Sequence, residues 1–125
     1  MKINSLLIVN AIVALIFGIA FVLVPGTVAS IYGVTPGAAV NLVGQFFGSA
    51  LIAVGLICWL IRNVTNAPAL KAVILAQLIA NVIGLVVSIL GTVGGTMNAV
   101  GWSSVVIYLV LALWFAYFQF LKPVS

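Results

Sequence analysis

Apolar stretches separated by turn-forming residues alternate along the whole chain. Four of them, residues 5–24, 38–61, 69–90 and 103–121, contain 20, 24, 22 and 19 residues. About 20 apolar residues in a helix, each rising about 1.5 Å, cross a hydrocarbon core about 30 Å thick. The stretches lack the strict alternation of apolar and polar residues that is typical of a transmembrane β-strand. The pattern therefore predicts an all-α fold of four transmembrane helices.

Turn-forming residues mark the ends of these helices. Pro25 stops the first stretch, while Asn66 is placed to cap the third helix, with Pro68 in its first turn. The connection at 25–37 still contains several apolar side chains. We therefore expect it to form a short segment at the membrane interface, with Tyr32 as an aromatic anchor.

The composition places the chain in a membrane. Hydrophobic residues make up 66% of the sequence and charged residues 3%, whereas about 25% of an ordinary soluble domain is charged. Because so few charges cannot keep a water-facing surface solvated, we predict an integral membrane protein embedded in a lipid bilayer. The length of 125 residues fits one transmembrane domain over residues 1–125.

The charged residues are all basic and indicate an orientation. They are Lys2, Arg62, Lys71 and Lys122. Four antiparallel, up-and-down spans put all of them on one side, which the positive-inside rule makes cytoplasmic, together with both termini. The charges flank apolar stretches rather than forming a basic face, so they do not indicate nucleic-acid binding. We expect a multi-pass protein of a prokaryotic plasma membrane.

The missing residue types exclude most catalytic chemistry. The sequence has no Asp, Glu or His, and its one cysteine, Cys58, lies inside an apolar stretch. Carboxylate pairs, Ser-His-Asp triads and zinc sites need residues that are absent, and proton-coupled transport needs a titratable group in the membrane. We predict no catalytic residue, no metal site, no enzyme activity and no cofactor of the chain's own. A lipid, quinone or pigment could still bind without a histidine ligand.

Small and polar residues recur at helical spacing in each predicted span. In lipid, helices associate through close packing and interhelical hydrogen bonds. One such stripe per span suits an antiparallel four-helix bundle. The stripes are Asn10, Ala14 and Gly18; Asn41, Gln45, Gly48, Ile52 and Gly55; Gln77, Asn81, Gly84, Ser88 and Gly91; and Ser104, Tyr108, Ala112, Ala116 and Gln119. The glycines expected to let helices approach closely are Gly44, Gly48, Gly55 and Gly84.

Polar side chains within the spans form two expected tiers. Counted from the outer helix ends, Gln45, Asn81 and Tyr108 lie 7, 9 and 5 residues deep. Asn10 and Gln77 lie 14 and 13 residues deep. These five are the candidate ligand-binding residues, because a polar niche in an apolar bundle suits a lipid headgroup, a quinone or another amphipathic molecule. Alternatively, the amides only bridge helices or face a protein partner.

The second span carries the residues of a family resemblance. It contains Gly-Gln-Phe-Phe-Gly at 44–48 and Gly-Leu-Ile-Cys-Trp at 55–59, after a first span that ends at Pro25. In this layout the chain resembles the DoxX-like group of small bacterial and archaeal four-span proteins. Members linked to quinone-dependent sulfur oxidation act with a partner subunit, so the resemblance implies an accessory or ligand-holding subunit. This chain differs from the group in lacking every acidic residue, and no enzymatic role is carried over.

Three functions agree with these observations. The leading expectation is a non-catalytic accessory subunit that packs its apolar faces against other membrane-protein subunits and holds lipid or cofactor in place. The alternative is a stand-alone binder or facilitator of a small amphipathic or apolar ligand such as a lipid or quinone. The third is a small pore-forming membrane protein.

Overall fold

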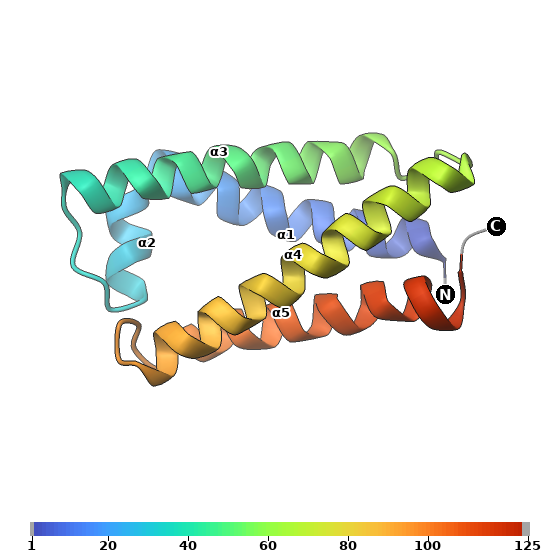
Figure 1. Cartoon of the computed structure of the whole chain (residues 1–125). Helices are drawn as coiled ribbons and strands as arrows, with labels where there is room; N and C mark the ends of the chain where they lie inside the picture. The colour runs from blue at the N-terminus through green and yellow to red at the C-terminus, as the bar shows by residue number, and fades with distance from the viewer. Residues whose placement is uncertain (1, 124–125) are drawn as a thin grey trace. The chain divides into compact units, whose positions relative to one another are not determined.

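The computed structural model describes residues 2–123, and over this range it contains helices and no strands. The elements are α1 (Ile3–Leu23), α2 (Pro25–Ile31), α3 (Ala38–Leu60), α4 (Ala67–Val93), α5 (Gly101–Ala116) and the π-helix η1 (Tyr117–Leu121) (Figure 1). Within the described residues, four helical stretches are long and apolar enough to cross a membrane, α5 and η1 together forming the last. The predicted all-α fold with four spans is confirmed, and the chain is a small four-span membrane protein.

Residue contacts divide the chain into two compact units, Met1–Arg62 and Asn63–Ser125. Each unit is built on an antiparallel pair of long helices, α1 with α3 in the first and α4 with α5 in the second. The helices of each pair are therefore also close to each other in the sequence. The expectation of a single domain over residues 1–125 stays a prediction.

The third span is longer than the sequence predicted. α4 begins at Ala67 rather than at residue 69, because Asn66 Oδ1 accepts a hydrogen bond from the Ala69 N–H at 3.1 Å and caps the first turn. The helix continues to Val93 instead of ending at residue 90. Apolar side chains indicated only the part suited to the hydrocarbon core, whereas backbone hydrogen bonding continues beyond it.

Glycines bring α1 and α3 into backbone contact. A Cβ atom built on Gly48 would lie 2.6 Å from the carbonyl oxygen of Gly18, and one built on Gly18 would lie 2.9 Å from the carbonyl oxygen of Gly48. Further along α3, a Cβ on Gly55 would lie 2.7 Å from Leu15 Cγ. Only hydrogen fits at these positions, so the two helices approach more closely than larger residues would allow.

A short helix, α2, follows α1 in the connection expected at the membrane interface. Pro25 is its first residue, where a missing backbone N–H leaves no helical hydrogen bond unmade. Val28 and Ala29 are buried. Gly33 then takes a positive φ of 76°, and the Val34 N–H bonds to the Ala29 carbonyl at 2.8 Å, which closes the helix end. The position of this segment relative to a membrane stays a prediction.

In the second unit, α5 changes to a wider helix near its end. The α-helical part stops at Ala116, and the Lys122 N–H then bonds to the Tyr117 carbonyl at 2.9 Å, the five-residue spacing of a π-helix. No sequence feature predicted this change. Since the wider turn alters the direction of each side chain that follows, it affects which residues of η1 face α4.

The buried face agrees with the predicted stripe best in α1 and least in α5. Asn10, Ala14 and Gly18 of α1 are all buried. In the fourth span only Ala112 of the predicted stripe is buried, and the other four members are half-buried. The buried side chains of this span are mainly large apolar ones beside the stripe. These are Val105, Leu111, Phe115 and Phe118.

Candidate functional site

Asn10, the candidate residue of the deeper predicted tier in the first unit, joins α1 to α3. Its side chain is buried, and its Nδ2 donates a hydrogen bond to Cys58 Sγ at 3.2 Å. Sulfur is a weak acceptor, so this contact is one modest link between the helices. Cys58 itself is fully buried. The position of Cys58 inside an apolar stretch did not indicate this polar contact.

Gln45, the candidate residue of the shallower predicted tier in the first unit, also reaches α1 from α3. Its Nε2 donates to the Val22 carbonyl at 3.2 Å, while the side chain as a whole is exposed. Gln45 and Cys58 are 13 residues apart on α3, which corresponds to about 20 Å along a helix. The contacts of Gln45 and Asn10 are therefore at separate levels of the pair.

The candidate residues of the second unit lie on neighbouring turns of α4 and on α5. Asn81 is buried, and its Nδ2 donates to the Gln77 carbonyl one turn earlier at 2.7 Å. The next turn carries Gly84, and a Cβ built there would lie 2.6 Å from Cδ1 of the Tyr108 ring. Asn81 thus bonds within its own helix, and the Tyr108 ring packs against Gly84.

The structure therefore brings some of the candidate residues together. Gln77 and Asn81 are in direct contact, and Gly84 holds Tyr108 one turn further along α4. Gln45 and Asn10 belong to the first unit, whereas Asn81, Tyr108 and Gln77 belong to the second. Each predicted tier combines residues of both units, so the tiers stay a prediction.

The predicted packing glycines differ in how closely they meet a neighbour. Gly48 and Gly55 lie against α1 at distances that exclude a Cβ atom. At Gly44, by contrast, a Cβ would sit 3.4 Å from Phe21 Cδ1, an ordinary contact. Of the two glycines one turn apart on α3, therefore, only Gly48 makes backbone contact with α1.

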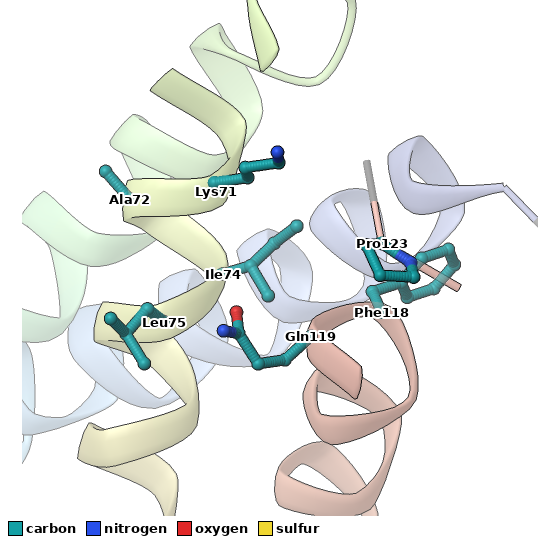
Figure 2. A pocket seen from close by; sticks show the side chains of 7 residues that line it. All are labelled: Lys71, Ala72, Ile74, Leu75, Phe118, Gln119 and Pro123. Atoms are coloured by element: carbon teal, nitrogen blue, oxygen red, sulfur yellow. The ribbon is translucent and has the colours of Figure 1, made fainter. Parts of the chain in front are cut away.

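A cavity that sequence reasoning missed lies in the second unit, between the start of α4 and the η1 end of the fourth span (Figure 2). Its volume is about 380 Å³. Four lining residues come from the first turns of α4 and three from η1 and the residues after it. They are Lys71, Ala72, Ile74, Leu75, Phe118, Gln119 and Pro123. We refer to this space as the Lys71 pocket.

The Lys71 pocket combines a cation, an amide and apolar walls. In Figure 2 the Lys71 side chain extends from α4 toward the side of Pro123, and the Gln119 amide points toward α4 below Ile74. Phe118 is buried and forms part of the apolar lining. The sequence contains no acidic side chain, so no Asp or Glu neutralises Lys71. The sequence indicated the lysine only as an orientation signal and Gln119 only as part of a helix stripe.

Two buried polar atoms lack a hydrogen-bond partner among residues 2–123. They are Asn41 Oδ1 and Trp114 Nε1. A buried polar atom without a partner costs free energy, about 1–3 kcal/mol for an uncharged group. Asn41 lies one turn before Gln45 on α3, so the N-terminal part of that helix has side-chain polar atoms without a partner at two successive turns.

The described residues contain no group of three or more His, Cys, Asp and Glu side chains that could hold a metal ion. The chemistry available to residues 2–123 is hydrogen bonding by amides and hydroxyls, charge from lysine and arginine, and apolar contact. These groups can bind and orient a molecule. The prediction that the chain is not an enzyme stays a prediction.

Comparison with protein-family models, with curated proteins and with solved structures gave no match. The resemblance to the DoxX-like group therefore rests on the hydropathy layout and the short segments of the second span, and it stays a prediction.

Proposed function

We propose that this protein is a non-catalytic accessory subunit of a larger membrane complex. In this role it packs the outer faces of its spans against helices of partner subunits and holds lipid between them. The observation that carries the proposal is Gln45, an amide on the exposed surface of α3 in the middle of large apolar side chains.

The surroundings of Gln45 favour a protein neighbour over lipid. Val43 and Phe46 beside it are 67% and 69% exposed. Gln45 donates one hydrogen bond to Val22, which leaves its carbonyl oxygen and a second N–H available. Lipid tails offer no hydrogen-bond partner, and an unsatisfied polar group in hydrocarbon is costly. A partner helix with one polar side chain would satisfy Gln45.

The extent of uncovered surface supports the same role. Only 17% of the residues in the apolar window of α3 are buried, against 33% in α1. α3 therefore makes close contact through a narrow glycine-lined face and leaves most of its circumference uncovered. The lack of Asp, Glu and His supports a role in assembly rather than in catalysis.

Site-specific photo-crosslinking in native membranes tests this proposal. A photoreactive residue replaces Val43 on α3, or Ile16 on α1 as the matched control, which is similarly exposed at 63% but lies on a helix face without an exposed amide. We expect the probe at position 43 to crosslink to one larger polypeptide, and the probe at position 16 to crosslink to lipid. Crosslinks from position 43 confined to lipid or to this chain would contradict the accessory role.

The Lys71 pocket favours the second candidate, a stand-alone binder of an amphipathic molecule, as the sequence also allowed. This candidate predicts that the chain leaves the membrane in mild detergent as a lone species with a stoichiometric small molecule. Native mass spectrometry of the extracted protein distinguishes the two candidates, because an accessory subunit would appear together with larger polypeptides.

A further inference from the structure

We propose that the Lys71 pocket binds the phosphate headgroup of an anionic phospholipid. Lys71 and Gln119 would hold the phosphate, and Leu75, which is 44% exposed, would contact the adjoining acyl chain beside the buried side chains of Ile74 and Phe118. The site is separate from the amides predicted from the sequence, and the proposal does not depend on the accessory role.

Charge is the first argument for this ligand. Lys71 is exposed at the opening of the pocket, and the chain contains no Asp or Glu with which it could pair. An anion is therefore the complementary ligand. Basic pockets between transmembrane helices are typical sites for acidic lipid headgroups.

Hydrogen-bonding capacity is the second argument. Among residues 2–123, the structure gives the Gln119 side chain no hydrogen-bond partner, and its amide points toward α4 (Figure 2). An amide N–H can donate to a phosphate oxygen. Two backbone N–H groups in the first turn of α4 are already used, because the Ala69 N–H bonds to Asn66 Oδ1 and the Leu70 N–H to the Asn66 carbonyl, and Pro68 has no N–H. The phosphate would thus be held by side chains.

The order of polar and apolar groups distinguishes a lipid from a free phosphate ion. Ile74 is one turn below Lys71 on α4 and is fully buried, and Leu75 lies beside it. Phe118 supplies an apolar wall from the π-helix. A phospholipid has its phosphate directly above its acyl chains, which agrees with this order. A free phosphate ion would gain nothing from the apolar lining. The cavity volume of about 380 Å³ is also within the range of small-molecule sites, about 300–1,000 Å³.

Lipid titration of the full chain in neutral detergent, followed by native mass spectrometry, tests the proposal. The probes are phosphatidylglycerol, phosphatidylcholine and inorganic phosphate. A neutral detergent adds no charge of its own, so phosphatidylglycerol is the only anionic lipid present. We expect the wild-type chain to bind phosphatidylglycerol more tightly than phosphatidylcholine. Lys71→Gln should weaken phosphatidylglycerol binding about ten-fold or more, as expected for loss of a hydrogen bond to a charged group.

Matched variants separate the pocket from a general charge effect. Lys2→Gln removes the same charge at an exposed residue that does not line the pocket, and it should change the affinity by less than about two-fold, because exposed charges outside the site are screened by salt. Lys71→Arg keeps the charge and should retain the lipid preference. Gln119→Leu should weaken phosphatidylglycerol binding, and an unchanged circular dichroism spectrum would show that the variant is folded.

Three results would overturn the proposal. They are equal losses in Lys71→Gln and Lys2→Gln, equal affinities of the wild-type chain for the two phospholipids, and displacement of phosphatidylglycerol by inorganic phosphate at similar concentration. The last result would assign the pocket to a soluble anion. These outcomes are independent of the crosslinking at Val43, so failure of one proposal is distinguishable from failure of the other.

Discussion

Two glycines one turn apart on α3 have different surroundings. A Cβ on Gly48 would meet the backbone oxygen of Gly18 at 2.6 Å, and backbone cannot move aside as a side-chain end can. A Cβ on Gly44 would meet a ring carbon of Phe21 at 3.4 Å, which is normal contact. The helical spacing of the two glycines is the same, so only the neighbouring helix makes them different.

We therefore expect Gly48→Ala to destabilise the α1–α3 pair by about 1–3 kcal/mol, the usual cost of overpacking. Gly44→Ala is the matched control, and it should be neutral or slightly stabilising because alanine favours helices over glycine by about 1 kcal/mol. Reversible unfolding in mixed detergent micelles measures both variants. Equal stability of the two would show that the close contact at Gly48 does not hold the helices together.

At the level of a single helix, two asparagines near the start of α4 differ in their role. α4 starts with the sequence Asn-Ala-Pro at 66–68, and the Asn66 side chain accepts the Ala69 N–H. Asn63 lies in the preceding turn, is exposed, and makes no side-chain hydrogen bond in the described part of the chain. The two asparagines have the same chemistry, but only one lies where a helix leaves a backbone N–H without an intrahelical partner.

Asn66→Ala should accordingly destabilise the start of α4 by about 0.5–2 kcal/mol, as for other lost caps. Hydrogen exchange of the Ala69 amide is the direct readout, and it should become faster. Asn63→Ala should leave that exchange rate unchanged. Faster exchange of the Ala69 amide in both variants would indicate a general loosening of the connection instead of a cap.

At the scale of the whole molecule, the question is orientation in the membrane. Arg62 follows α3, its guanidinium lies 3.9 Å from the centre of the Trp59 ring, and its Nη1 donates to the Trp59 carbonyl at 2.6 Å. A cation and an indole held together at a helix end suit a membrane–water interface. This arrangement agrees with the proposed cytoplasmic position of the connection that follows.

Single cysteines at Thr35 and Thr65, on the two connections that flank α3, test this orientation in a Cys58→Ala background. Both threonines are exposed. We expect a membrane-impermeant thiol reagent added outside intact cells to label Thr35→Cys at once, and Thr65→Cys only after permeabilisation. The reverse result would show that the orientation is opposite to the predicted one. Labelling of both cysteines from outside intact cells would mean that α3 does not cross the membrane.

The sequence alone determined the number of spans, their approximate ranges and the absence of acidic and histidine chemistry. Span length follows from the thickness of a bilayer, and the choice of helix follows from the need to pair every backbone group inside it. These constraints act locally, so they can be read from successive residues. The cap at Asn66 was predictable for the same reason, whereas Pro25, expected only to stop the first stretch, also begins the short helix α2.

The tertiary structure decided which of the small and polar residues meet a neighbour. Gly44 and Gly48 are indistinguishable by spacing, and the contact of Asn10 with Cys58 joins residues 48 positions apart. The Lys71 pocket lies where Phe118 and Gln119 of the π-helix η1 meet the first turns of α4. Such a site requires two distant segments to converge with side chains in particular directions. Helix packing sets those directions, and the order of residues along one helix does not contain them.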